Sequence, residues 1–122
     1  MSRTDDVTIH MLGHFSVLVN GASVEPVLCK SRKGVALLQL LILQNGEPVP
    51  NQKLYETLCY GEKTARPENA LKTLISRFRT IMSGCSDTLA RCIETERGSY
   101  SFSRRLGIRV DLYDLLNLKQ QL

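Results

Sequence analysis

The stretch of this sequence best suited to chemistry is residues 69–82, NALKTLISRFRTIM. Its apolar residues recur every three or four positions, so they form one stripe of a helix that must pack on a core. The other side carries an amide, hydroxyls and cations: Asn69, Lys72, Thr73, Ser76 and Thr80, with Arg77 and Arg79 beside the stripe. The stretch contains no acidic residue, whereas an ordinary solvated face usually mixes both charge signs. This face suits phosphates and base edges, and a plain amphipathic surface helix is the alternative.

Positive charge is concentrated in the middle of the chain. The 122 residues carry a formal net charge of +4 at pH 7, but residues 30–109 hold 14 Lys or Arg and 7 Asp or Glu, a local excess of +7. Acids such as Asp5, Asp6, Asp111 and Asp114 lie near the two ends. We therefore expect the middle of the chain to bind a polyanion.

Two other classes of protein are disfavoured. The longest apolar run, residues 35–43, is too short to span a bilayer, and the N-terminal MSRTDD has no signal-peptide core. We expect a cytoplasmic protein without a membrane partner. The four cysteines and two histidines lack metal-ligand spacing, which favours small buried thiols over a zinc site or disulfides.

Enzyme motifs are absent from the sequence. It has no phosphate-binding glycine loop, no nucleophile elbow and no clustered carboxylates. We expect no catalytic residue, no metal and no cofactor, so the protein is predicted not to be an enzyme. Turnover that depends on Cys59 or His14 would support the opposite interpretation.

The elements that position the basic helix begin with strands. Residues 7–12 and 15–20 alternate apolar and polar side chains, and Asn20-Gly21 is a hairpin signal that leads into ASVEPV, so a small antiparallel sheet is predicted. Residues 35–43 are apolar on nearly every side and end at Asn45-Gly46. This pattern predicts a helix buried between layers with a left-handed stop.

A second, shorter helix is predicted after Pro50, with Asn51 as its cap. The basic helix then begins with Pro67 in its first turn. Residues 92–95 and 100–103 indicate two strands joined by a turn with Arg97 and Gly98 at its tip. Together the patterns predict an α+β fold, a winged helix-turn-helix with an N-terminal antiparallel sheet, three helices and a C-terminal β-hairpin wing.

The start of the buried helix offers a second anion site. Arg32 and Lys33 lie beside backbone N–H groups that have no partner within the helix, and such groups bind phosphate well. Solvated cations at a simple helix start are the alternative.

Four stretches resemble the OmpR/PhoB-type winged-helix family, most closely its SARP (antibiotic regulatory protein) branch of transcriptional activators. They are LGHFSVLVNGASV in the opening hairpins, LLQLLILQNGEPVPNQKLYETL in the buried and positioning helices, NALKTLISRFRTIM in the recognition helix and IETERGSYSF in the wing. The resemblance implies a DNA-binding domain over residues 7–105, after a disordered N-terminus at residues 1–6. Residues 106–122 are similar to the linker and first helix of a bacterial transcriptional activation domain that is truncated here.

Some positions depart from the family pattern. Leu74 stands where the family often has a phosphate-contacting histidine, and an apolar side chain there can only pack. Cys59-Tyr60 replaces a tryptophan, and the wing reads RGSY in place of the longer RGxGY. We therefore expect the wing tip to reach DNA differently, with Tyr100 packed beneath it.

The polar and basic residues, some of which match the family pattern, suggest specific contacts. Base edges are assigned to Asn69, Lys72, Thr73 and Arg77, phosphates to Arg32, Lys33, Ser76, Arg79 and Thr80, and the minor groove to Arg97 and Gly98. Arg79 paired with Glu68 or another surface acid, Arg97 offsetting Glu94 and Glu96, and Asn69 bonded locally are the alternatives. Lys72 and Thr73 facing only solvent is another.

The leading hypothesis is a sequence-specific double-stranded DNA-binding module of a bacterial transcription factor. The resemblance implies an activator that is a monomer when free and binds direct repeats near promoters as a head-to-tail pair. It also implies that a loop with Glu62, Lys63, Thr64 and Arg66 contacts RNA polymerase, including its sigma subunit. A winged-helix protein–protein interaction module without DNA binding is the alternative.

Overall fold

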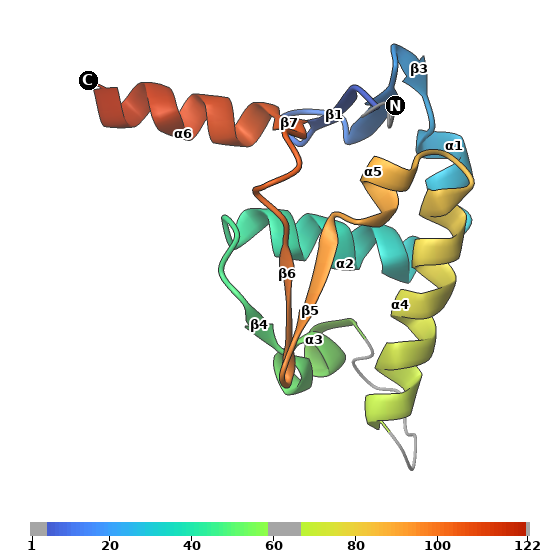
Figure 1. Cartoon of the computed structure of the whole chain (residues 1–122). Coiled ribbons are helices and arrows are strands. Elements are labelled where there is room, and N and C mark those ends of the chain that lie inside the picture. The colour runs from blue at the N-terminus through green and yellow to red at the C-terminus, as the bar shows by residue number, and fades with distance from the viewer. Residues whose placement is uncertain (1–4, 59–66, 122) are drawn as a thin grey trace.

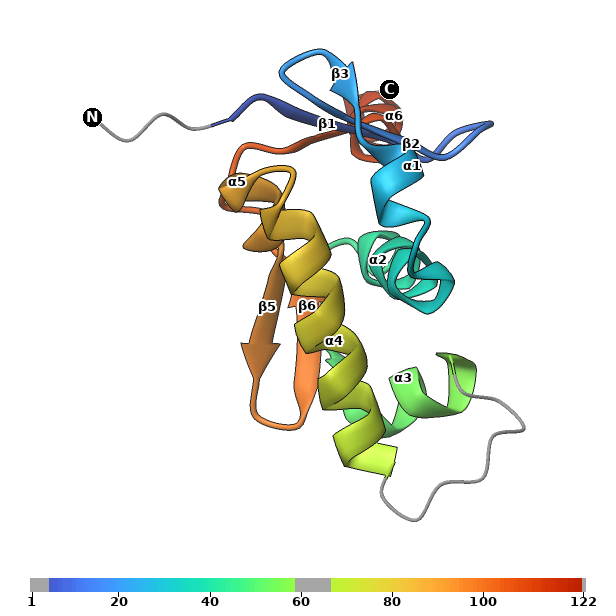
Figure 2. The same cartoon turned by 90° about the vertical axis from the view of Figure 1, so that its right-hand side faces the viewer.

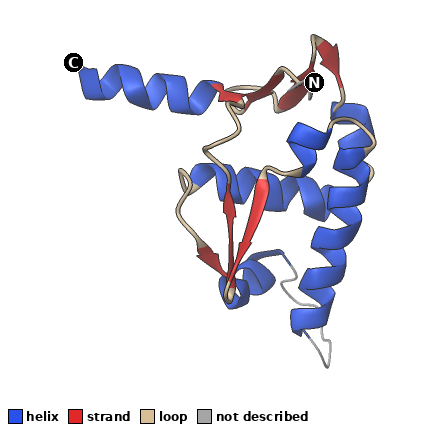
Figure 3. Ribbon diagram, viewed as in Figure 1, coloured by secondary structure: helices blue, strands red, loops and turns tan. Residues whose placement is uncertain are grey.

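The computed structural model describes residues 5–58 and 67–121, and their side chains except those of 67–68 and 117–121. The elements are β1 (Val7–His10), β2 (Ser16–Val19), β3 (Ala22–Ser23), α1 (Glu25–Leu28), α2 (Arg32–Leu43), β4 (Val49–Pro50), α3 (Asn51–Leu58), α4 (Pro67–Ser83), α5 (Asp87–Ala90), β5 (Ile93–Glu96), β6 (Ser99–Phe102), β7 (Arg109–Val110) and α6 (Asp111–Gln121). Two sets of strands lie on opposite sides of α2, and α4 runs along one side of the molecule (Figures 1 and 3).

The first sheet has the strand order β3-β2-β1-β7. Its first three strands are antiparallel, as predicted, and Asn20 and Gly21 form the turn between β2 and β3 with φ values of 52° and 86°. The fourth strand, β7, pairs with β1 in the parallel direction and was not predicted. The sheet is therefore mixed, and a late segment of the chain completes it.

The strand predicted through ASVEPV is shorter than expected. Only Ala22 and Ser23 pair with β2, and the chain then turns into the short helix α1. Pro26 explains the change, because proline has no N–H to donate to a sheet but is well suited to the first turn of a helix.

Helix α2 forms the centre of the core. The hydroxyl of Ser31 caps its start by accepting a hydrogen bond from the Gly34 N–H at 3.1 Å, and Asn45 and Gly46 end it with positive φ values of 57° and 88°. The predicted burial of α2 between layers does not extend to Leu43, which is 58% exposed. The helix is covered on most of its surface but keeps one edge open.

Helix α4 packs on α2 through an unusually close contact. Its core residues are Leu71, Ile75, Phe78 and Met82, all buried. A Cβ atom added to Gly34 would lie 2.2 Å from Cδ1 of Phe78. Glycine at position 34 therefore sets the distance between the two helices. After α4, the hydroxyl of Ser86 caps the short helix α5, which was not predicted, by accepting from the Leu89 N–H at 3.2 Å.

The second sheet contains the wing and has the order β4-β6-β5. Strands β5 and β6 form the predicted antiparallel hairpin, with Glu96 opposite Ser99 and Gly98 at a φ of 69° in the turn. Strand β4 pairs with β6 and joins the wing to the start of α3. In Figure 2 the hairpin runs alongside α4.

Helix α6 starts beside the first sheet and extends away from the rest of the domain (Figure 1). Its first turn is nevertheless firmly attached, because the Tyr113 hydroxyl donates to the Ile42 carbonyl at 2.6 Å and the Asp111 carboxylate accepts from the Met11 N–H at 2.7 Å. Leu115 and Leu116 further along are 40% and 37% exposed. The predicted division of the chain at residues 6 and 105 stays a prediction.

Candidate nucleic-acid interface

The exposed face of α4 is the polar face predicted from the sequence. Six of the predicted contact residues on it are exposed: Asn69, Lys72, Thr73, Ser76, Arg77 and Thr80. Leu74 is half-buried and packs against the core, as expected for an apolar residue at that position. Among the described residues, Lys72 and Arg77 form no ion pair. Their charges are available to a polyanion.

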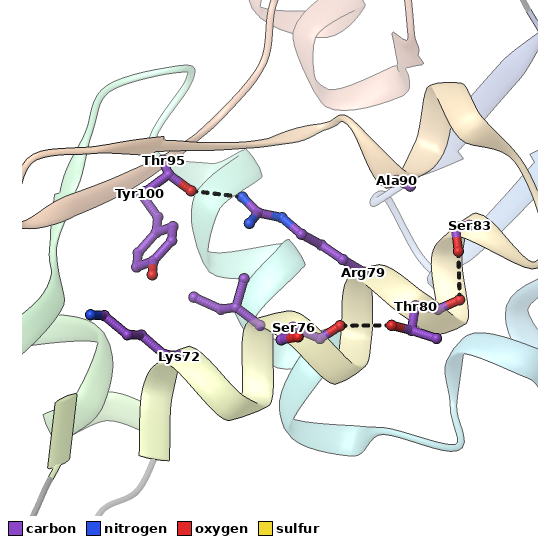
Figure 4. Close-up of a pocket in the computed structure, with 9 residues that line it drawn as sticks. Lys72, Ser76, Arg79, Thr80, Ser83, Ala90, Thr95 and Tyr100 are labelled. Atoms are coloured by element: carbon purple, nitrogen blue, oxygen red, sulfur yellow. Dashed lines mark hydrogen bonds between the residues drawn. The ribbon is translucent and has the colours of Figure 1, made fainter. Parts of the chain in front are cut away.

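A cleft of about 580 Å³ separates α4 from the wing (Figure 4). Lys72, Ser76, Arg79, Thr80 and Ser83 line it from the helix, and Thr95 and Tyr100 line it from the hairpin. No acidic side chain is among the described residues that line this cleft. It is open and carries the cations Lys72 and Arg79 beside several hydroxyls, which suits a phosphate backbone.

The two hydroxyls at the far end of this face have internal acceptors. The Thr80 hydroxyl donates to the Ser76 carbonyl at 3.1 Å, and the Ser83 hydroxyl donates to the Thr80 carbonyl at 2.9 Å. For Thr80 to contact a phosphate as predicted, its hydroxyl must turn away from the helix backbone. The cations are therefore better placed than Thr80 to hold a phosphate.

Arg79 lies in an unexpected position. Its Nη2 atom donates to the Ile93 carbonyl at 2.7 Å and to the Thr95 hydroxyl at 2.8 Å, across the cleft (Figure 4). The side chain is half-buried, and its partners are neutral groups of β5. The Glu68 side chain that was considered as a partner lies outside the described residues.

The wing presents one exposed cation at its tip. Arg97 is exposed and forms no ion pair with Glu94 or Glu96, which are described in full. The carbonyl of the adjacent Gly98 accepts from the Asn51 N–H at 2.9 Å, so the tip is tied to the start of α3. Tyr100 is buried beneath the wing, as expected.

The structure does not support Asn51 as a side-chain cap. Its Oδ1 atom is buried and has no hydrogen-bond partner among the described residues. The backbone N–H of the same residue points to the wing, where it bonds to Gly98. Asn51 directly follows β4, and this hydrogen bond to Gly98 fixes the backbone at the start of α3.

The remaining predicted contacts lie elsewhere. Arg32 and Lys33 line a separate groove between α2 and the end of α3, together with Leu40, Leu43 and Thr57. They are not part of the cleft beside the wing. Glu62, Lys63, Thr64 and Arg66 lie outside the described residues.

The geometry agrees with a known family. The family model described as transcriptional regulatory protein, C terminal, matches residues 26–100, from α1 to the wing. The chain belongs to this family. It is a winged-helix DNA-binding domain of the OmpR/PhoB type, a regulatory domain and not an enzyme.

One solved structure with the same fold is EmbR of Mycobacterium tuberculosis, determined in complex with a low-affinity phosphopeptide. The TM-score is 0.60 and the sequence identity is 19%, over 84% of this chain and 26% of the EmbR chain. This chain therefore spans about a quarter of EmbR. At this level of identity the match shows that the two proteins share a fold, and the predicted resemblance to the SARP branch stays a prediction. No curated protein matches the sequence.

Other kinds of site find no support in the described part of this OmpR/PhoB-type domain. No helix there is long and apolar enough to cross a membrane, and no cluster of three potential metal ligands occurs. Burial raises the pKa of the Cys92 thiol to about 12, despite the opposing charge of Arg79, so this cysteine is an unreactive core residue at neutral pH.

Sequence reasoning missed the partners of Arg79. Thr95 and the Ile93 carbonyl were not singled out, because the bonds join residues 16 and 14 positions apart and depend on how α4 and β5 pack. The outward position of Thr95 in an alternating strand was the available signal.

Proposed function

We propose that this domain binds double-stranded DNA in a sequence-specific manner, with α4 in the major groove and the wing tip in the adjacent minor groove. The observation that supports this best is the exposed polar face of α4, which carries no acid over residues 69–83, beside a wing that carries an exposed arginine. Helices of this diameter fit the major groove, and a single cation at a hairpin tip fits a narrow minor groove.

The polar residues of α4 then take different roles. Arg77 is proposed to donate two hydrogen bonds to a guanine edge, and the exposed Asn69, Lys72 and Thr73 are proposed to contact neighbouring base edges. Ser76 and Thr80 are proposed phosphate contacts at the cleft, and Arg32 and Lys33 are proposed phosphate contacts outside it. Arg97 and Gly98 contact the minor groove.

We further propose that the natural protein is a cytoplasmic bacterial activator. Two copies would bind direct repeats head to tail, with the segment that contains Glu62, Lys63, Thr64 and Arg66 contacting RNA polymerase and its sigma subunit. The free domain is expected to be a monomer, because most apolar side chains of its core helices are already buried.

Selection of bound sequences from a random duplex library tests the proposal. We expect enrichment of a direct repeat, and sedimentation should show one protein on a one-site duplex and two on a two-site duplex. Tighter binding to the separated single strands than to the selected duplex would contradict duplex recognition. A stable dimer without DNA would contradict the head-to-tail arrangement, and no enrichment would favour the protein-interaction module.

A further inference from the structure

Arg79 connects the two parts of the domain that are proposed to contact DNA. Its side chain leaves α4, crosses the cleft and bonds to β5 through a single terminal nitrogen (Figure 4). The acceptors, the Ile93 carbonyl and the Thr95 hydroxyl, belong to the outer strand of the wing hairpin. In the described structure this is a direct polar link between the C-terminal half of the recognition helix and the wing.

The Ile93 carbonyl is on the open edge of the sheet. Strand β5 is the last strand in the order β4-β6-β5, so one edge of its backbone has no neighbouring strand. The Cys92 carbonyl accepts from the Ser103 N–H and thus faces β6. Because carbonyls alternate along a strand, that of Ile93 faces away from β6, and Arg79 supplies the donor that a further strand would have supplied.

The bonds use the charge of Arg79 without cancelling it. A hydrogen bond from a guanidinium is stronger than one between neutral groups, and both acceptors here are neutral. The positive charge therefore remains in the cleft, while the two bonds limit how far the hairpin can swing from α4.

We infer that Arg79 is a positioning residue that fixes the angle between α4 and the wing, so that Arg97 reaches the minor groove when α4 lies in the major groove. This inference rests on the proposed DNA binding. It differs from the phosphate contact expected from the sequence, because Arg79 would act through the wing and thus through Arg97.

A double-mutant cycle separates these roles. Duplex affinity is measured by fluorescence anisotropy for the wild type, Arg79→Ala, Arg97→Ala and the double variant, on sites with A/T-rich and G/C-rich flanks. Arg97→Ala alone should weaken binding to the A/T-rich flank by about fivefold, the size of one hydrogen bond. In the Arg79→Ala protein the same change should cost less than about twofold, because the wing has lost its polar link to α4 and keeps only its attachment to β4 and the start of α3.

Thr95→Val is expected to affect DNA binding differently if Arg79 positions the wing than if it contacts a phosphate directly. It removes only the hydroxyl acceptor and keeps a β-branched residue in the strand. For a positioning role, it should reduce the preference for the A/T-rich flank by roughly two- to fivefold. If Arg79 contacted phosphate directly, releasing it from Thr95 would leave affinity unchanged or raise it. Thr8→Val, the same change in β1 of the other sheet, is the matched control.

Two further measurements complete the experiment. Arg79→Lys keeps the charge and one donor group, so it should recover part of the flank preference that Arg79→Ala loses. Thermal melting confirms that each variant is folded, and Thr95→Val and Arg79→Lys carry the test if Arg79→Ala is unfolded. If the fold losses of affinity for Arg79→Ala and Arg97→Ala simply multiply in the double variant, the two residues act independently. That result would overturn this inference and leave the proposed DNA binding intact. Failure of the wild type to bind any duplex would overturn the proposed function as well.

Discussion

The two sheets of this domain use their charged side chains in opposite ways. At the first sheet, carboxylates accept internal hydrogen bonds: Asp111 from the Met11 and Leu12 N–H groups, and Asp5 from the Ser86 hydroxyl at 2.6 Å. At the second sheet and α4, Lys72, Arg77 and Arg97 are exposed and form no ion pair with a described residue. The carboxylates of Asp111 and Asp5 therefore stabilise the scaffold, meaning the first sheet and its attachments, whereas Lys72, Arg77 and Arg97 are available to bind a partner.

This difference predicts how variants should separate. Changes at the scaffold should lower stability and leave the pattern of DNA contacts intact, whereas changes on the exposed face of α4 or the wing tip should lower affinity at constant stability. Arg79 is an exception, since it is a cation of the second region with internal hydrogen bonds.

The largest expected effect is on stability, at the contact between α2 and α4. Gly34→Ala should lower the free energy of unfolding by about 2–3 kcal/mol, because the new methyl group overlaps the Phe78 ring in a packed core. Chemical denaturation measures it. Gly84→Ala is the matched control, because a Cβ there meets its nearest atom at an ordinary 3.4 Å. Equal effects of the two changes would contradict the close contact.

The next effect is on recognition. Arg77→Ala should weaken binding to the preferred site by about 2 kcal/mol and relax specificity at one base pair, with little change in melting temperature. Arg109→Ala removes an exposed cation from the first sheet and should have a much smaller effect. Equal losses on preferred and random duplexes would remove Arg77 from base recognition.

A third prediction concerns acid sensitivity at the first sheet. The pKa of Asp111 is lowered because, although burial raises it, hydrogen bonds from the Met11, Leu12 and Leu112 N–H groups and the nearby His10 outweigh that effect. A lowered folded-state pKa stabilises the protein above the unfolded value of about 3.9, and this stabilisation is lost as the pH falls through the folded value.

Asp111→Asn should therefore lower stability at neutral pH by about 1 kcal/mol and flatten its dependence on pH below about 4. Denaturation at a series of pH values measures both. Asp114→Asn, one turn further along α6, is the control. An unchanged acid dependence for Asp111→Asn would mean that the carboxylate does not fasten this end of the scaffold.

The smallest effect is expected at the wing tip. Arg97→Ala should cost on the order of 1 kcal/mol on A/T-rich flanks and less on G/C-rich flanks, since narrow minor grooves concentrate negative potential. Affinities for duplexes that differ only in the flank measure this. The same loss on both flanks would leave Arg97 as a non-specific surface charge.

Long periodic patterns and turn signals were enough to predict most of this fold. The recognition helix was clear because its stripe extends over four turns, and Asn20-Gly21 and Gly98 marked the two hairpins. Strands β4 and β7 have two residues each, and α1 and α5 have four, which is too short to show a period. These elements form because neighbouring segments supply partners, as Tyr100 does for Val49.

The candidate site was predictable to a similar degree. Exposure of the polar face of α4 follows from its periodicity, so the residues on that face could be named in advance. The bonds of Arg79 depend on the distance between α4 and β5, which local patterns do not determine. The separation of Arg32 and Lys33 from the cleft likewise follows from the packing of α2 on α3.

The salt dependence of duplex binding by the whole chain tests the central claim most directly. If α4, its surroundings and the wing neutralise about five phosphates, the logarithm of the affinity should fall with the logarithm of the salt concentration with a slope near −4 to −5. Titrations from about 50 to 200 mM salt on one selected duplex cover a sufficient range. A slope close to zero would contradict DNA binding through this exposed basic face.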